Sequence, residues 1–240
     1  MLLSPFDARV LPSLSDEPQL YPDARRPAAQ PDFAYRSGRV YPLRSPLDPP
    51  TLDTWLQETG AVGFSGRITL LAVGSNAYPR QLHDKLHDTP ADADGLITVC
   101  ARVAGLDIAY CPIRARKGYV PVTLASRPGA VRRTWLQWLT PAQLEVISAT
   151  EGSRYALVGG RPLAALVTLA PQLPKPDHVY AWWFDSLLSF GARRLWLDEH
   201  EQSDVWRRFS SLDSVSQSPP SDWTIVDRAR PNWPTRIAPM

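Results

Sequence analysis

The sequence has few cysteines and no long apolar run, and each shortage excludes a class of protein. Its 240 residues include 2 cysteines, Cys100 and Cys111, which are too few for a disulfide framework. We expect two buried thiols in a cytoplasmic protein. No segment approaches the ~18 consecutive apolar residues of a membrane helix, and the first residues do not resemble a signal peptide. No membrane partner is therefore expected.

The sequence also has little excess charge. Lys and Arg total 26 and Asp and Glu total 24, which gives a formal net charge of +2 with the basic residues scattered. This is too little to indicate a nucleic-acid partner. A content of 44% hydrophobic residues is typical of a globular protein with a real core. The pattern gives no indication of the oligomeric state.

Proline is abundant, with 25 residues in all. They are dense in the first 50 residues, where they interrupt any helical or strand periodicity. We expect residues 1–65 to form a Pro-rich N-terminal arm that lies extended across the main domain, with a short helix at Thr51–Glu58. The main domain is expected to span residues 66–212, and residues 213–240 to form an irregular C-terminal tail.

The main domain opens with a short apolar run, Ile68–Val73, that ends in Gly74-Ser75-Asn76. This pattern predicts a buried strand entering a turn, with Asn76 as the N-cap of a helix. The segments that follow predict further strands, a turn and a helix. They are a strand at 96–110, a strand at 119–125, a turn at 127–129, a returning strand at 131–139, strands at 155–158 and 163–169, and a helix at 186–196.

The clearest helix signal follows Leu139. Thr140 is a typical N-cap, Pro141 suits the first helical position, and Gln143 completes a capping box. The helix is expected to stop at Gly152. Because strands and helices alternate without a regular βαβ rhythm, the sequence predicts an α+β fold.

Two features of the main domain could carry chemistry. Glu151 stands at a helix end, where the macrodipole is negative and a basic residue would be favoured; such violations are enriched at functional sites. Gly74, Ser75 and Asn76 lie between a buried strand and a helix, where successive backbone N–H groups can bind an anion or oxyanion. Each signal is weak alone. An acid exposed at a frayed helix end would give the first pattern, and small residues required only for steric reasons in a turn would give the second.

Other residues suggest alternatives. His83 and His87 have a spacing that can bind a metal, but no third ligand accompanies them, and a polar helix face bearing Asp84 and Asp88 explains them better. Ser75 could be a nucleophile only if a base such as His178 or His200 lay beside it.

Three segments in this order resemble the γ-glutamylcyclotransferase family, including its relatives that act on γ-glutamyl amines. The segment 70–76 resembles the family's Tyr-Gly-Ser-Asn substrate loop, and 119–144 resembles its central hairpin and following helix. That helix ends in Glu151-Gly152, which matches the family's catalytic Glu-Gly, with Tyr155 shortly after. The resemblance covers about residues 66–195.

The resemblance implies a small mixed β-barrel flanked by helices, in which the loop and the acid meet at one pocket. A γ-glutamyl compound cyclises when its own α-amino group attacks its γ-carbonyl, which releases an amine and 5-oxoproline. Glu151 would be the general acid/base, and Val73, Gly74, Ser75, Asn76 and Tyr155 would bind the substrate. Because the nucleophile belongs to the substrate, neither metal nor cofactor is expected.

The sequence also departs from the family pattern. Val73 stands where the family has the loop tyrosine, and the segment 147–150 lacks the acid that usually precedes the Glu-Gly pair. Two alternatives therefore stay open. The same fold could be a non-catalytic ligand-binding or interaction module, or it could carry out another amide reaction with the same carboxylate.

Overall fold

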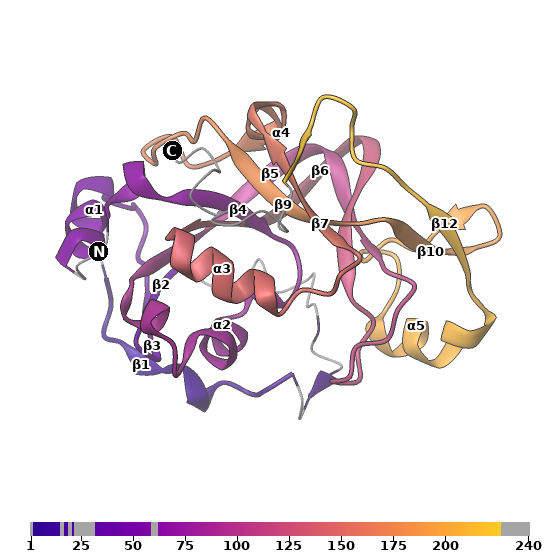
Figure 1. Cartoon of the computed structure of the whole chain (residues 1–240), viewed down its shortest axis with the longest axis horizontal. Helices are drawn as coiled ribbons and strands as arrows, with labels where there is room; N and C mark the ends of the chain where they lie inside the picture. Colours follow the sequence, from indigo (N-terminus) through magenta and orange to yellow (C-terminus); the bar gives the residue numbers. More distant parts are fainter. Residues whose placement is uncertain (1, 15–16, 19–20, 22–31, 59–61, 227–240) are drawn as a thin grey trace.

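The computed structural model describes residues 2–14, 17–18, 21, 32–58 and 62–226. Its main feature is a ten-stranded sheet, in which β4 and β9 are parallel and the other neighbours antiparallel (Figure 1). In sheet order the strands are β1 (Phe6–Asp7), β3 (Arg39–Pro42), β2 (Phe33–Arg36), β5 (Leu96–Tyr110), β6 (Val122–Leu139), β4 (Ile68–Ala72), β9 (Val179–Phe184), β7 (Tyr155–Gly160) and β13 (Thr224–Val226), with β8 (Val167–Thr168) paired to β5. A second sheet has the order β11 (Arg193–Arg194), β10 (Ser186–Phe190) and β12 (Asp213–Ser216).

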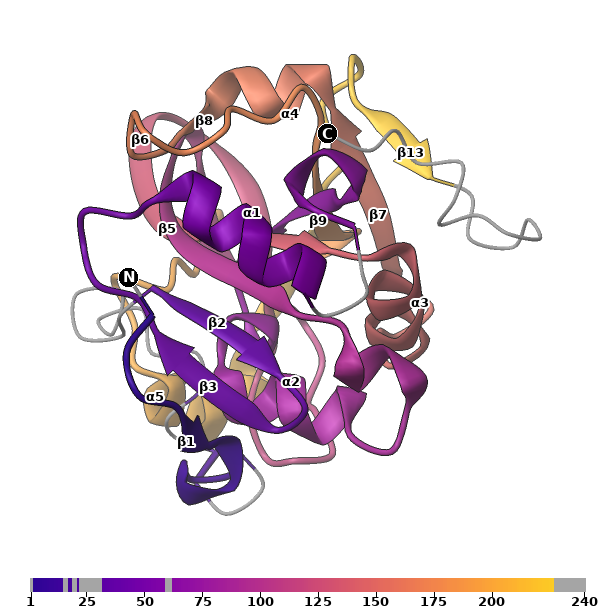
Figure 2. The ribbon, with the colours of Figure 1, turned by 90° about the vertical axis from the view of Figure 1, so that its left-hand side faces the viewer.

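The helices are short. They are α1 (Pro49–Glu58), α2 (Pro79–Leu86), α3 (Pro141–Ala149), α4 (Arg161–Leu166) and α5 (Gln202–Arg208), with 3₁₀ turns η1 (Ala8–Val10), η4 (Phe64–Gly66), η5 (Ser75–Ala77), η6 (Pro90–Ala93) and η7 (Phe209–Ser211). Figures 1 and 2 show α2 and α3 close together, away from α4. No helix in the described part of the chain is long and apolar enough to cross a membrane.

The predicted α+β class is confirmed, but the described strands do not close into the small mixed β-barrel that the resemblance implied. The path of paired strands ends at β1 and at β13, and within the described ranges these two strands do not pair with each other. The strands β2, β3 and β1 extend the sheet on the far side of β5. The far edge of β5 is shared by β2, which pairs at Leu96–Thr98, and by β8, which pairs at Arg102 and Val103.

The described part of the N-terminal 65 residues differs from the expected extended arm. β2 pairs with β5 of the main sheet, and Leu52 and Leu56 of α1 are buried in the core. The prolines near these elements stand at their ends: Pro42 closes β3, while Pro49 and Pro50 begin α1. At such places proline costs no ladder or helix hydrogen bond, so a high proline content is compatible with regular structure.

The central hairpin also differs from the prediction. Instead of reversing at residues 127–129, the chain continues through them as one strand, β6, which pairs with β5 along almost its whole length. The register shifts between Ala104 and Leu106, with Gly105 at a φ of +72°. Pro128 and Gly129 therefore belong to an irregularity that bends a long hairpin, and not to its turn.

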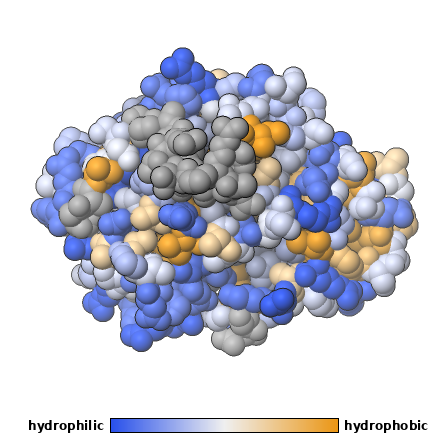
Figure 3. All heavy atoms as spheres, in the orientation of Figure 1, coloured by the Kyte–Doolittle hydropathy of each residue, from blue (hydrophilic) through white to orange (hydrophobic). Residues whose placement is uncertain are grey.

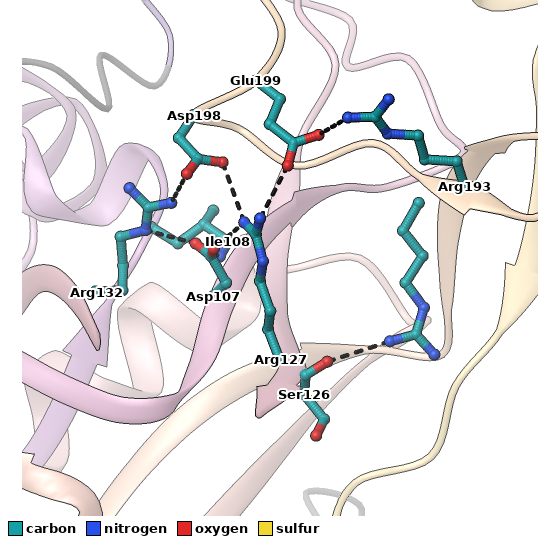
Figure 4. A network of polar contacts seen from close by, with 9 residues as sticks. Asp107, Ile108, Ser126, Arg127, Arg132, Arg193, Asp198 and Glu199 are labelled. Carbon is teal, nitrogen blue, oxygen red and sulfur yellow. Dashed lines mark hydrogen bonds and ion pairs between the residues drawn. The ribbon is translucent and has the colours of Figure 1, made fainter. Parts of the chain in front are cut away.

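An ion-pair network anchors this irregular region (Figure 4). The carboxylate of Asp107 in β5 is only 3% exposed and pairs with Arg127 at 2.6 Å and Arg132 at 2.5 Å, both from β6. Arg132 also reaches Asp198 at 2.8 Å, and Arg127 reaches Glu199 at 2.9 Å. The network joins both halves of β6 to the segment that follows β11.

Two later predictions fail for a common reason. Residues 186–196 were expected to be helical, but they form β10 and β11 around Gly191, whose φ is +59°. Residues 163–166, expected in a strand, belong to α4. Apolar runs this short do not show a clear helical or strand periodicity, so sequence pattern alone cannot separate the two.

The expected irregular tail contains two strands, β12 and β13, within residues 213–226, while 227–240 lie outside the described residues. Figure 3 shows a mostly hydrophilic face, with apolar side chains gathered on the side of β10 and β12. Phe190 of β10 and Val215 of β12 are among the exposed large apolar residues.

Candidate functional site

The site begins with the loop that leaves β4. After Ala72 the chain enters η5, whose hydrogen bonds run from Ala77 N to Gly74 O (3.1 Å) and from Tyr78 N to Ser75 O (3.0 Å). Asn76 is therefore not the N-cap of α2, as the sequence suggested; Tyr78 takes that position. The backbone N–H groups of Gly74, Ser75 and Asn76 precede the first bond of the turn, so the turn itself gives them no acceptor.

The second element of the site is α3, which forms as predicted. The Thr140 side chain accepts from the Gln143 backbone N–H at 3.2 Å, and the Gln143 side chain accepts from the Thr140 N–H at 3.0 Å. The helix ends at Ala149, and Glu151 follows it with its N–H bonded to Ser148 O at 3.1 Å. The capping box thus fixes the helix that delivers Glu151.

The loop and Glu151 meet directly, and Lys85 joins them. Asn76 Nδ2 donates to Glu151 Oε1 at 3.0 Å, and Lys85 Nζ donates to the same oxygen at 2.9 Å. Lys85 Nζ also donates to Asn76 Oδ1 at 2.7 Å. The side chains of Lys85 and Glu151 are 9% and 14% exposed. This ammonium offsets the unfavourable position of a carboxylate just beyond a helix C-terminus.

A pocket of about 340 Å³ opens beside this cluster. Of the residues predicted from sequence, Ser75 and Glu151 line this pocket. Asn76 is not part of the lining, but its side chain is hydrogen-bonded to Glu151. The full lining is Ser75, Gln81, Asp84, Lys85, Ala115, Arg116, Lys117, Tyr119, Thr150 and Glu151. Its volume lies at the lower end of the range for small-molecule sites.

The other predicted binding residues lie outside this lining. Val73 is buried in the core, and Gly74 faces the Tyr21 hydroxyl so closely that a Cβ would stand 2.6 Å from it. The buried Tyr155 donates its hydroxyl to Val122 O at 3.2 Å and lies 3.3 Å from Cys111 Sγ. Burial raises the pKa of Tyr155 well above its usual value, so the phenol stays protonated.

Two tyrosines that the sequence reasoning missed build the wall behind the loop. The rings of Tyr21 and Tyr119 stack with centroids 3.8 Å apart, and Tyr21 Oη accepts from the Val122 N–H at 3.2 Å. Burial raises the pKa of Tyr119, and a hydrogen bond with the Ser75 side chain opposes that rise. Tyr119 opens the segment 119–144 that resembles the family's central hairpin, whereas nothing in the sequence connects Tyr21 with this loop.

The charged residues of the pocket were also missed. Asp84, expected on a solvent face, pairs with Arg80 at 2.8 Å and with Lys117 at 3.7 Å. Lys117 also donates to Gln81 Oε1 at 3.1 Å. Gln81 and Lys85 are four residues apart on α2, and this spacing on one helix face is the signal that could have placed them together.

The structure does not support the two histidine alternatives. The rings of His83 and His87 are 5.0 Å apart, and the described residues contain no group of three or more His, Cys, Asp or Glu side chains suited to a metal. Burial lowers the pKa of His83, whose Nδ1 lies 3.3 Å from Tyr35 Oη. No histidine is among the described residues that line the pocket, so Ser75 has no imidazole base there.

No family model matches the chain, and no curated protein does. Among solved structures, an uncharacterized human protein aligns over 50% of this chain and 67% of its own, with 14% identity and a TM-score of 0.36. A structure named γ-glutamyl cyclotransferase aligns over 61% of this chain and 88% of its own, with 10% identity and a TM-score of 0.37. Likenesses this weak carry no argument about fold or function, so the function must be argued from the site.

Proposed function

We propose that the chain is a cyclotransferase that acts on a γ-glutamyl amide or amine and releases 5-oxoproline, with Glu151 as general acid/base. The observation that carries this proposal is the direct contact between Asn76 of the loop and Glu151, beside a pocket lined by Glu151 and Ser75. The reaction requires no nucleophile from the protein, because the attacking amine belongs to the substrate.

In this proposal Glu151 takes a proton from the substrate's α-ammonium group. Both Asn76 and Lys85 donate to Oε1, and the described residues supply no donor to Oε2. That oxygen can therefore meet the substrate. A positioned acid/base of this kind contributes about 10²–10⁴-fold to the rate.

The loop would hold the substrate folded for ring closure. The backbone N–H groups of Gly74, Ser75 and Asn76 would bind its carboxylate or the developing oxyanion, and a fixed geometry would bring the α-nitrogen onto the γ-carbonyl carbon. The buried Val73 and Tyr155 would support the loop and the pocket wall instead of contacting the substrate.

The experiment is to incubate the purified chain with γ-glutamyl-alanine, γ-glutamyl-ethylamide and Nε-γ-glutamyl-lysine and to measure 5-oxoproline by mass spectrometry. α-Glutamyl-alanine is the matched control, because it has no amide at the γ-carbon and cannot expel an amine on ring closure. We expect 5-oxoproline from at least one γ-glutamyl compound and none from the control. If no γ-glutamyl compound gives 5-oxoproline, the proposal is wrong.

A second candidate function is ligand binding without reaction. The observation that favours it is the ion pair of Glu151 with Lys85, because this ammonium and the Asn76 amide already occupy one oxygen of the carboxylate. This candidate predicts that γ-glutamyl compounds raise the melting temperature of the chain while no amine or acid product is released. Release of an acid other than 5-oxoproline would instead indicate a different amide reaction.

A further inference from the structure

The Lys85 ammonium group is the one component of the cluster whose role the proposed reaction has not used. It carries three protons. One is donated to Glu151 Oε1 at 2.9 Å and another to Asn76 Oδ1 at 2.7 Å. Lys85 lines the pocket, and the described residues offer no acceptor for its third proton.

The charge state of the cluster gives this third proton a use. In an ion pair at rest the proton resides on nitrogen, so Glu151 is ready to accept a proton and Lys85 is ready to donate one. Cyclisation needs both events: the α-ammonium group must lose a proton before it attacks, and the leaving nitrogen must gain one before it departs as an amine. A single carboxylate would have to complete the first transfer before it could begin the second.

Resting on the proposed function, we propose that Lys85 is a second catalytic residue, the general acid that protonates the leaving amine. Glu151 takes a proton from the α-ammonium group, and the freed lone pair forms the bond to the γ-carbonyl carbon. As the bond from that carbon to the leaving nitrogen breaks, Lys85 donates its proton to the leaving nitrogen. Glu151 then returns its proton to Lys85 Nζ along their 2.9 Å contact.

The proton balance of this step closes without a co-reactant. The α-nitrogen passes from three protons to the single proton of the lactam, and the leaving nitrogen passes from one proton to the three of an ammonium ion. One of the two protons travels through Glu151 and Lys85, and the released amine takes the other. Both protein groups end in their starting state.

The cluster is held in a way that suits this transfer. Asn76 contacts both partners, donating to Glu151 and accepting from Lys85. Its backbone oxygen in turn accepts from Gln137 Nε2 of β6 at 2.8 Å. The three side chains come from three elements: Asn76 from the loop, Lys85 from α2 and Glu151 from the end of α3. The bond from Gln137 fixes the loop to the sheet.

The test compares two substrates that differ in how much the leaving nitrogen needs a proton. γ-Glutamyl-ethylamide releases a strongly basic alkylamine, whereas γ-glutamyl-p-nitroanilide releases a weakly basic aniline whose departure depends far less on proton donation by an acid. We expect Lys85→Met to lower kcat on the ethylamide by about 100-fold or more, in the range for general acid catalysis, and on the anilide by less than about 5-fold. Lys85→Arg, which keeps a charge but holds its protons more firmly, should show the same bias.

The ratio of the two rates within one protein sample is independent of how much of a variant folds. Lys175→Met, on an exposed loop, is the control and should leave the ratio unchanged. Equal losses of Lys85→Met on both substrates, or no loss on either, would overturn the proposal and make Lys85 a structural partner of Glu151. If the wild-type chain releases 5-oxoproline from neither compound, the proposed function fails instead.

Discussion

At the scale of single residues, the Tyr21 hydroxyl occupies the space that a side chain at position 74 would need. A Cβ on residue 74 would stand 2.6 Å from Tyr21 Oη, so Gly74→Ala should lower the free energy of unfolding by about 1–3 kcal/mol. Urea denaturation measures this loss. Gly152→Ala is the matched control, because no heavy atom lies within 4 Å of a Cβ there, and it should be neutral or slightly stabilising.

The same contact predicts that two substitutions are coupled. Tyr21→Phe leaves the buried Val122 N–H without its acceptor and should cost about 1–3 kcal/mol on its own. Combined with Gly74→Ala it also removes the oxygen that the new Cβ would meet. The double variant should therefore lose less stability than the two single losses added together. Strict additivity would show that the two residues do not touch.

Which site residues the sequence could reveal follows from their chemistry. Glu151 was found because an acid at a helix end breaks a local rule, and Ser75 because it stands at a strand-turn junction. Lys85 by itself did not stand out, since a lysine in the last turn of a helix is favoured anyway, and only its spacing from Gln81 could have placed it at the site. Tyr21 reaches the loop only through tertiary folding, and no local pattern records such a contact.

At the scale of elements, the capping box of α3 controls where Glu151 stands. Thr140 Oγ1 accepts from the Gln143 N–H and also donates to Asp94 Oδ2 at 2.9 Å. Thr140→Ala should therefore lower the free energy of unfolding by about 1–2 kcal/mol, as loss of an N-cap does. Thr54→Ala, at an exposed position of α1, is the control and should change stability by less than about 0.5 kcal/mol. Equal effects in urea denaturation would contradict the capping role.

The elements that could be predicted are those with their own end signals. α3 has a threonine cap, a proline at its first position and a capping box, and its start is correct to the residue. The strand that enters the loop has a clear apolar run. Residues 186–196 have no such signal: β10 is buried at four of its five positions, so its pattern shows no alternation and was taken for a helix.

At the scale of the whole molecule, Asp107 ties together segments far apart in the chain. Asp107→Asn would leave Arg127 and Arg132 without their shared carboxylate. Removing one partner of a buried pair costs about 3–5 kcal/mol; these arginines are 33% and 19% exposed, so we expect about 2–3 kcal/mol. Asp185→Asn is the control, because the Asp185 carboxylate is 57% exposed and pairs with Arg154. In urea denaturation it should lower the free energy of unfolding by less than about 1 kcal/mol. A loss this small for Asp107→Asn would contradict the network.

The overall arrangement of the sheet was the part least accessible from sequence. The mixed α+β class follows from the order of local patterns, but the pairing of β2 with β5 joins residues about sixty positions apart. Each proline in this region was interpreted as breaking regular structure, although Pro42, Pro49 and Pro50 stand at the ends of elements. Whether a sheet closes depends on which strands occupy its edges, and that is decided by such long-range pairings.

The central claim is that the Glu151 carboxylate performs the chemistry of the pocket. Glu151→Gln keeps the side chain's shape and its Oε1 acceptor for Asn76 and Lys85 but removes the charge. The most direct measurement is the rate of 5-oxoproline release by this variant beside Glu145→Gln, an exposed glutamate of the same helix. The account predicts a loss of at least about 100-fold for Glu151→Gln and a wild-type rate for Glu145→Gln. Equal rates for the two variants would contradict it.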